Sequence, residues 1–363
     1  MKIVFEKRKS VSIAALFLVP AVSFFVSLIL TGLVLLAFGT DPFVTFGAMF
    51  QGAFGSKNGF SETLVKAIPL MLTGLGVALA FKLKFWNIGA EGQLVLGGIA
   101  AAWVGLFLSG TIPPSLLLPA IIVAGCAAGA LWASVPAFLK TRLKVDETLV
   151  TLMMNYVAIL FAEYLYYGPW RDPKGYGFPG SAPLPEAAWL PRLFGRAHIG
   201  IFFALVLALI LWIVIKRTRW GFELSIIGAS PKAARYQGIA VQRNIFLAVI
   251  LSGALSGLAG VCEVTGISHR LQQGLNLGYG FTAIIIAWMS QLNPIAVPFV
   301  ALVMAGILVG GDQVQLMMGL PSAMGTVMQG LILFPMLAGS LFTEYKIKRI
   351  KRIPASACAE GEA

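Results

Sequence analysis

The stretch SIIGASPKAARYQG, residues 225–238, is a polar island between two long apolar runs. Ser230 can accept hydrogen bonds from free backbone N–H groups as an N-cap, and Pro231 suits the first position of a helix. Gly238 is the residue type at which helices end. The pattern predicts a short helix, and a helix of this length is not stable alone. It therefore needs a larger structure to pack against.

The composition of the chain is that of a membrane protein. Its 363 residues are 58% hydrophobic and only 12% charged, with 40 glycines, whereas soluble domains carry about 25% charged residues. We therefore predict an all-α, polytopic integral membrane protein. The three cysteines have neither the spacing of a metal site nor that of a disulfide framework.

Ten apolar runs are candidates for membrane helices over residues 13–342. Several are shorter than the roughly 20 residues of a simple span, which predicts broken or tilted helices. The first run lacks a clear signal-peptide cleavage site, so we expect it to remain as an anchor. The runs cover residues 11–38, 64–81, 88–109, 116–139, 148–168, 199–215, 244–266, 277–290, 295–310 and 323–342.

The distribution of lysine and arginine predicts the orientation. The chain has 27 of them and a formal net charge of +12. With both termini inside, most of the 27 fall on inner segments, as the positive-inside rule requires, so the charge is explained without nucleic acid. This predicts a cytoplasmic basic N-terminus (1–12), an outer loop (168–198), a cytoplasmic coupling loop (217–243) and a cytoplasmic basic tail (343–363) whose end we expect to be disordered.

The two halves of the chain also echo each other. Asn87-Ile88-Gly89 opens the third run and Asn276-Leu277-Gly278 opens the eighth. The two runs are five spans apart, an odd number, so the second copy would be inverted. A five-plus-five inverted repeat with a broken helix in each half is an architecture of transporters. The same repeat pairs the Ser230-Pro231 helix with a second capped helix beginning at Asp41-Pro42.

Four segments resemble one family. FWNIGAEGQLVLGG (85–98), DETLVTLMMNYVA (146–158), IGASPKAARYQGI (227–239) and GYGFTAIIIAWMSQLNP (278–294) resemble the permease subunits of bacterial ABC importers for simple sugars and nucleosides, most closely the nucleoside branch. The resemblance implies a multi-pass protein of the bacterial inner membrane. Its implied partners are a cytoplasmic ABC ATPase, a second permease subunit, identical or homologous, and an extracytoplasmic solute-binding protein.

The resemblance also implies that the polar island is the coupling helix, which docks in a groove of the ATPase. A rigid helix between two spans can transmit a rigid-body movement. The alternative is a solvated basic loop. The residues implied in ATPase coupling are Ser230, Pro231, Lys232, Ala233, Ala234, Arg235 and Gly238.

Polar residues inside apolar runs are the candidates for a substrate pathway. Glu91 falls in the first turn of a helix, and an intramembrane carboxylate predicts a functional site. Alternatively, it complements the helix dipole and bonds to nearby amides. Asn87 and Gln93 can face a solute or link helices. Asn155 is the best pathway candidate of the fifth run; Tyr156 and the repeat-related Asn276 complete the set.

The flanks of the fifth run have structural or partner-binding interpretations. Asp146 and Glu147 precede the run, where carboxylates suit a helix N-terminus better than an ATPase contact. The Pro- and Gly-rich segment 168–198 is an outer loop. It is either a contact for the binding protein or a plain connector.

No motif for catalysis or phosphate binding is present, so we predict a transport subunit rather than an enzyme, with no cofactor and with ATP used by a partner. The resemblance to the nucleoside branch implies a nucleoside as the solute. The alternatives are a simple sugar such as ribose, xylose or galactose, and, from another class, a secondary transporter coupled to an ion gradient.

Overall fold

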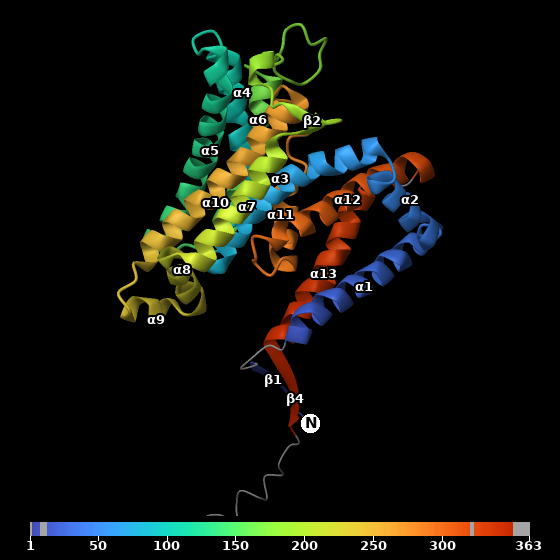
Figure 1. Cartoon of the computed structure of the whole chain (residues 1–363), viewed down its shortest axis with the longest axis vertical. Helices are drawn as coiled ribbons and strands as arrows, with labels where there is room; N and C mark the ends of the chain where they lie inside the picture. The colour runs from blue at the N-terminus through green and yellow to red at the C-terminus, as the bar shows by residue number, and fades with distance from the viewer. Residues whose placement is uncertain (1, 8–12, 320–322, 351–363) are drawn as a thin grey trace, which may run out of the picture. The chain divides into compact units, whose positions relative to one another are not determined.

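A computed structural model describes residues 2–7, 13–319 and 323–350 (Figure 1). The chain divides into two compact units. The larger unit runs from Phe46 to Gly325, and the smaller unit combines residues 1–45 with residues 326–363.

The smaller unit contains helix α1 (Ile13–Ala37), most of helix α13 (Met324–Glu344) and a two-stranded ribbon. Strand β1 (Lys2–Lys7) pairs antiparallel with strand β4 (Tyr345–Ile350). We expected an all-α chain with a basic segment at each end. The ribbon differs from this expectation, because it pairs the two basic segments as strands. Valine, isoleucine and phenylalanine in β1 are residues that are frequent in strands. The tail end that we expected to be disordered, residues 351–363, lies outside the described residues.

The larger unit is built from helices, with two very short strands. Helix α2 begins at the predicted cap, because Asp41 Oδ1 accepts a hydrogen bond from Phe43 N at 2.8 Å. The helices are α2 (Pro42–Phe54), α3 (Lys57–Lys82), α4 (Ala90–Phe107), α5 (Pro114–Phe138), α6 (Glu147–Tyr167), α7 (Gly200–Arg217), α8 (Arg219–Ala229), α9 (Pro231–Tyr236), α10 (Val241–Glu263), α11 (Tyr279–Met289) and α12 (Ala296–Met318); π-helical turns at Leu139–Leu143 and Val264–Ser268 extend α5 and α10. Strands β2 (Arg192–Phe194) and β3 (Ala197–His198) pair in the segment between α6 and α7.

Each of the ten predicted apolar runs coincides with a helix. Among the described residues, seven helices are long and apolar enough to cross a membrane, and α1 with α2 counts as an eighth if that bent pair is one span. Helix α11 has only 11 residues, about 16 Å of helix, which is half the thickness of a bilayer core. The chain is therefore a helical membrane protein with at least one helix too short to span alone.

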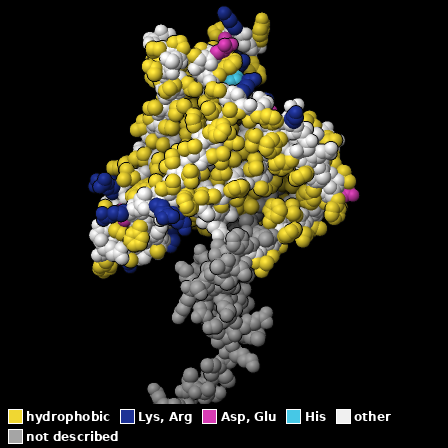
Figure 2. Space-filling view, viewed as in Figure 1, with side chains coloured by type: hydrophobic (Ala, Val, Ile, Leu, Met, Phe, Trp, Pro, Cys, Tyr) yellow, Lys and Arg dark blue, Asp and Glu magenta, His cyan; other side chains and the backbone are white. Residues whose placement is uncertain are grey.

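Burial separates the central helices from the peripheral ones. In the most apolar 18-residue window, 89% of α3 and 67% of the α10 span are buried, against 28% for α5, α6 and α7. Helix α10 packs on α5, α4 and α3, while α3 also packs on α12 and α11. The apolar outer faces of the peripheral helices suit contact with lipid, and Figure 2 shows this apolar cover, with lysine and arginine gathered at the end of the larger unit that carries α8 and α9.

Glycines let α5 and α10 approach very closely. Each helix carries a G-x-x-x-G motif, Gly125 with Gly129 and Gly253 with Gly257. A Cβ atom placed on Gly257 would lie 2.3 Å from the carbonyl oxygen of Gly125, and one on Gly129 would lie 2.2 Å from that of Gly253. Small residues at this spacing are typical of membrane helices that pack backbone against backbone. The crossing holds the two helices at a fixed place along their lengths.

Candidate functional site

The predicted coupling segment forms a helix with the expected caps. Ser230 Oγ accepts a hydrogen bond from Ala233 N at 3.3 Å, and Pro231 is the first residue of α9. The chain leaves the helix through Gly238, whose φ is +75°, a value that favours glycine. The helix predicted around Ser230 is therefore confirmed, while its docking to an ATPase stays a prediction.

The faces of α9 differ in exposure. Ala234 is fully buried, so its side chain packs inside this protein and is not available to a partner. Lys232, Ala233 and Arg235 are exposed. Tyr236, which our sequence analysis did not single out, is 93% exposed. An exposed aromatic side chain beside two cations is the stronger candidate for a contact with another protein.

Helices α7, α8 and α9 follow one another with single residues between them. Thr218 ends α7 and caps α8, where its Oγ1 accepts from Gly221 N at 3.2 Å; Ser230 has the same double role between α8 and α9. Asn244 of α10 then fastens α8, because it accepts from Trp220 Nε1 at 3.1 Å and donates to Glu223 Oε2 at 2.7 Å. The coupling segment is thus attached rigidly to the spans on both sides.

The segment NIGAEGQ forms a hydrogen-bonded junction in the core. Asn87 and Gln93 are both buried and exchange two side-chain hydrogen bonds, at 3.2 and 3.0 Å. Asn87 Nδ2 also donates to Ser252 Oγ of α10 at 3.0 Å. These amides bond to protein groups, which is the helix-linking alternative that the sequence left open.

Glu91 joins the N-termini of two helices. It lies in the first turn of α4 and is 1% exposed. Its Oε1 accepts from Gly278 N at 2.9 Å and its Oε2 from Gly280 N at 2.6 Å, so the carboxylate also caps α11. A negative charge is favourable at both helix N-termini. The backbones are in contact here, since a Cβ on Gly280 would lie 2.2 Å from Glu91 N.

Asn155 ties α6 to the same junction. Its Oδ1 accepts from Gly92 N at 2.8 Å, and its Nδ2 donates to Ile88 O at 2.8 Å. The neighbouring Tyr156 is 54% exposed, and Asn276, just before α11, is exposed. The structure therefore brings four predicted pathway residues together, Asn87, Glu91, Gln93 and Asn155. Tyr156 and Asn276 lie on the surface of the chain.

Asp146 and Glu147 stabilise the start of α6. Asp146 Oδ1 accepts from Thr148 N at 2.8 Å and Leu149 N at 3.2 Å, and these bonds hold the pKa of Asp146 below its usual range. Glu147 pairs with Lys140. Both contacts agree with the structural interpretation of these two carboxylates.

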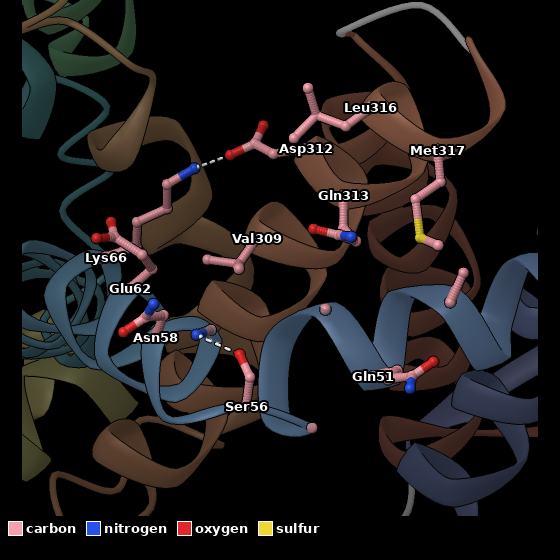
Figure 3. A pocket seen from close by; sticks show the side chains of 14 residues that line it. Gln51, Ser56, Asn58, Glu62, Lys66, Val309, Asp312, Gln313, Leu316 and Met317 are labelled. Carbon is pink, nitrogen blue, oxygen red and sulfur yellow. Dashed lines mark hydrogen bonds and ion pairs between the residues drawn. The ribbon is translucent and has the colours of Figure 1, made fainter.

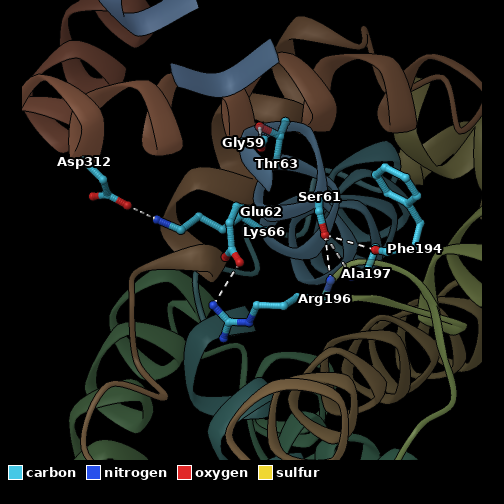
Figure 4. Close-up of polar contacts among 9 residues, drawn as sticks. All are labelled: Gly59, Ser61, Glu62, Thr63, Lys66, Phe194, Arg196, Ala197 and Asp312. Atoms are coloured by element: carbon cyan, nitrogen blue, oxygen red, sulfur yellow. Dashed lines mark hydrogen bonds and ion pairs between the residues drawn. The ribbon is translucent and has the colours of Figure 1, made fainter. Parts of the chain in front are cut away.

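A charged region that our sequence analysis did not single out lies at the end of the larger unit that carries β2 and β3. Lys66 of α3 pairs with Asp312 of α12, and Glu62 of α3 pairs with Arg196 Nη1 at 2.9 Å (Figure 4). Ser61 Oγ accepts from Arg196 N at 2.7 Å and donates to Phe194 O at 3.0 Å, which holds the turn between β2 and β3 against α3.

Helices α2, α3 and α12 line an open cavity of about 520 Å³ beside these ion pairs (Figure 3). Its polar lining includes Gln51, Asn58, Glu62, Lys66, Asp312 and Gln313. The volume is within the range of small-molecule sites. The turn between β2 and β3, which lies within the predicted outer loop 168–198, contributes Arg196 to the same region, so this loop contacts α3 through an ion pair.

The two histidines lie near this region without forming a metal site. His198 is buried, and its Nδ1 accepts from Gly200 N at 3.2 Å. Burial, with a smaller effect of the neighbouring His269, lowers the pKa of His198 to about 4. His269 stacks on Trp189 with ring centroids 4.1 Å apart. Within the described part of the chain, no group of three or more His, Cys, Asp or Glu side chains could hold a metal ion.

Comparison with known proteins connects this architecture to transport. The profile of the family described as "Branched-chain amino acid transport system / permease component" matches residues 59–337. A glucose ABC transporter permease protein of Haloferax volcanii is 34% identical over 354 residues, covering 94% of this chain and 92% of that protein.

Two relatives come from Bacillus subtilis. Its guanosine ABC transporter permease protein NupP is 32% identical over 340 residues, covering 92% of this chain and 97% of that protein. Its guanosine ABC transporter permease protein NupQ is 29% identical over 245 residues, covering 64% of this chain and 75% of that protein.

Proposed function

This chain belongs to the ABC transporter permease family that matches its residues 59–337, and on that basis we propose that it carries nucleosides inward as the permease subunit of an ABC importer. As a permease component it is not the catalytic subunit, so ATP is hydrolysed by a partner. Family membership removes the ion-coupled symporter that the sequence left as an alternative. The proposal that the solute is a nucleoside rests on the sequence identity to NupP, which extends along almost the full length of both chains.

The ATPase would dock on α9. The exposed Lys232, Arg235 and Tyr236 supply its contact surface. The single-residue joints at Thr218 and Ser230 and the Asn244 hydrogen bonds support a rigid connection from that surface to α7 and α10. Movement of the ATPase would then tilt the spans and alternate access to the solute.

For the arrangement in the membrane, we propose ten spans in a five-plus-five inverted repeat with both termini in the cytoplasm. The two segments that the sequence pairs as repeats, Asn87-Ile88-Gly89 and Asn276-Leu277-Gly278, precede α4 and α11, and Glu91 bonds those two helix starts together. Half-helices with N-termini near the middle of the membrane are typical of such transporters. The Lys and Arg cluster around α8 and α9 supports a cytoplasmic position for that end.

We assign the junction of Asn87, Glu91, Gln93 and Asn155 to the wall of the solute pathway, with Tyr156 and Asn276 on the surface that a second permease subunit would cover. A paralogous second subunit is the better candidate, because Bacillus subtilis has two guanosine permease proteins that are both similar to this chain. A solute-binding protein would deliver the solute to the end that carries β2 and β3.

A sugar is the second candidate solute, because the Haloferax volcanii glucose permease is 34% identical over almost the full chain. Uptake of labelled guanosine and labelled glucose in cells with and without the gene distinguishes the two. We expect guanosine uptake to depend on the gene and to be competed by nucleosides but not by glucose, ribose, xylose or galactose. Gene-dependent glucose uptake with unchanged guanosine uptake would replace the nucleoside by a sugar.

A further inference from the structure

Glu263, the last residue of α10, is a buried carboxyl group that the junction at Glu91 does not use. It is 7% exposed, and its Oε2 is buried without a hydrogen-bond partner. No described lysine, arginine or histidine forms an ion pair with it, because Lys66 and Arg196 pair with Asp312 and Glu62 instead. Burying a carboxyl group without a partner costs free energy, so a site that keeps one points to a ligand.

Glu263 lines a cavity of about 470 Å³, which we call the Glu263 cavity. The volume is large enough for a small solute. Its wall also includes Phe178, Arg196, Ser268, Arg270 and Gln272. Phe178 is 55% exposed, so its side chain lies at the edge of the cavity and remains accessible to a ligand.

The two loops that form the wall are fastened to each other. Gly180 and Gln272 form an isolated β-bridge. Ser181 N donates to Leu271 O at 2.8 Å, and Ser181 Oγ accepts from Leu271 N at 3.0 Å. Phe178 and Gln272 are therefore held on one folded platform and do not depend on a ligand to be brought together.

The charges of the wall select the kind of ligand. A free cation would be repelled by Arg196 and Arg270, and a free anion would lie against the buried carboxyl group of Glu263, whose oxygens cannot donate to it when the group is ionised. A metal cation also needs several oxygen ligands, and Glu263 belongs to no group of three or more His, Cys, Asp or Glu side chains within the described residues that could hold a metal ion. A neutral ring with several hydroxyl groups suits both signs, because its hydroxyls donate to a carboxylate and its oxygens accept from guanidinium groups.

We propose that the Glu263 cavity is an entry site that binds the sugar ring of the transported solute. This inference rests on the proposed function, and the ring is shared by a nucleoside and a free sugar. Glu263 accepts hydrogen bonds from two ring hydroxyls, the arginines and Gln272 bond to the remaining oxygens, and Phe178 covers the apolar face of the ring or the attached base. Arg196 links the site to Glu62 and so to the cavity between α2, α3 and α12.

The test uses the full-length chain purified with its second permease and ATPase subunits, without the binding protein. Equilibrium binding of labelled guanosine, guanine, ribose and glucose is measured on the wild type and on Glu263→Gln and Phe178→Ala. The matched controls are Glu186→Gln, an exposed carboxylate of the same loop segment, and Phe194→Ala, an exposed phenylalanine of β2; neither lines the cavity.

We expect guanosine to bind and guanine, which lacks the sugar ring, not to bind. Glu263→Gln should weaken guanosine binding about tenfold or more, since the amide of glutamine offers one acceptor oxygen where the carboxyl group offers two, and one hydroxyl then loses its hydrogen bond. Phe178→Ala should weaken binding by a smaller factor, and both controls should bind like the wild type. If glucose or ribose competes with guanosine, the free sugar uses the same site.

Three results overturn the proposal. One is guanosine binding that is unchanged in Glu263→Gln. The second is binding of guanine as tight as that of guanosine. The third is guanosine binding that is unchanged in Phe178→Ala, which would leave the aromatic ring at the edge of the cavity without a role in the site. If Glu263→Gln does not fold, as judged by gel filtration, the guanosine affinities of Phe178→Ala and Gln272→Ala decide whether the cavity binds the solute. Failure of the proposed function is separate: wild-type cells would then take up neither solute.

Discussion

Replacing Glu91 measures the free energy that holds α4 and α11 together. The carboxylate accepts from Gly278 N and Gly280 N at 2.9 and 2.6 Å inside the core. A buried donor left without an acceptor costs about 1–3 kcal/mol, so Glu91→Ala should lower the free energy of unfolding by about 2–6 kcal/mol. Glu91→Gln keeps an acceptor for one donor and should lose about half of that.

Unfolding by SDS in mixed micelles, followed by tryptophan fluorescence, gives this free energy for the purified permease. The matched control is Glu62→Ala, because the Glu62 and Arg196 side chains are 33% and 58% exposed and such pairs contribute less than about 1 kcal/mol. A Glu91→Ala protein within about 0.5 kcal/mol of the wild type, and no less stable than Glu62→Ala, would refute the role of the carboxylate in the junction.

Three further outcomes are expected. Gly257→Ala should abolish or sharply reduce the yield of folded protein, since its Cβ would lie 2.3 Å from a carbonyl oxygen, while the same change at Gly47, where nothing lies within 4 Å, should not; equal yields on gel filtration would contradict the close crossing. The pKa of His198 is lowered from 6.5 to about 4 in the folded protein, so between these two pH values the unfolded chain binds a proton that the folded protein does not. The free energy of unfolding should therefore be highest above pH 6.5 and fall by roughly 3 kcal/mol as the pH drops from 6.5 to 4. His198→Gln should flatten this part of the curve of unfolding free energy against pH, and an unchanged slope would show that other groups cause it. Tyr236→Ala should leave thermal unfolding unchanged and reduce co-purification of the ATPase subunit; undiminished capture would argue against α9 as the docking surface.

Local signals in the sequence predicted the helices well. Ser230, Pro231 and Asp41 act through neighbours two or three residues away, so their roles could be inferred from spacing alone. The apolar runs located the long helices for a similar reason, because a run of apolar residues indicates by itself a segment that is removed from water, in the protein core or in the membrane. For Glu91 the sequence predicted a place in the first turn of a helix, which the structure confirms, and left open whether the carboxylate serves a functional site or bonds to nearby amides.

Contacts between distant segments could not be predicted in this way. The amides that bond to Glu91 belong to Gly278 and Gly280, 187 and 189 positions further along the chain. Arg196 lies 134 positions from Glu62, and Asp312 lies 246 from Lys66. No periodicity connects such residues. The Glu263 cavity was missed for the same reason, because its wall combines residues from two loops and the end of α10.

The single-residue joints at Thr218 and Ser230 imply that the segment formed by α8 and α9 tolerates substitution far better than a change of length. One inserted residue advances a helix by about 1.5 Å and rotates the chain beyond it by about 100°. Within α8 it would turn Ala234 out of its packed position and carry Lys232, Arg235 and Tyr236 to another side, because only Ser230 separates α8 from α9. The exposed surface of α9 can therefore change residue by residue, whereas a single inserted residue would move the whole surface out of position.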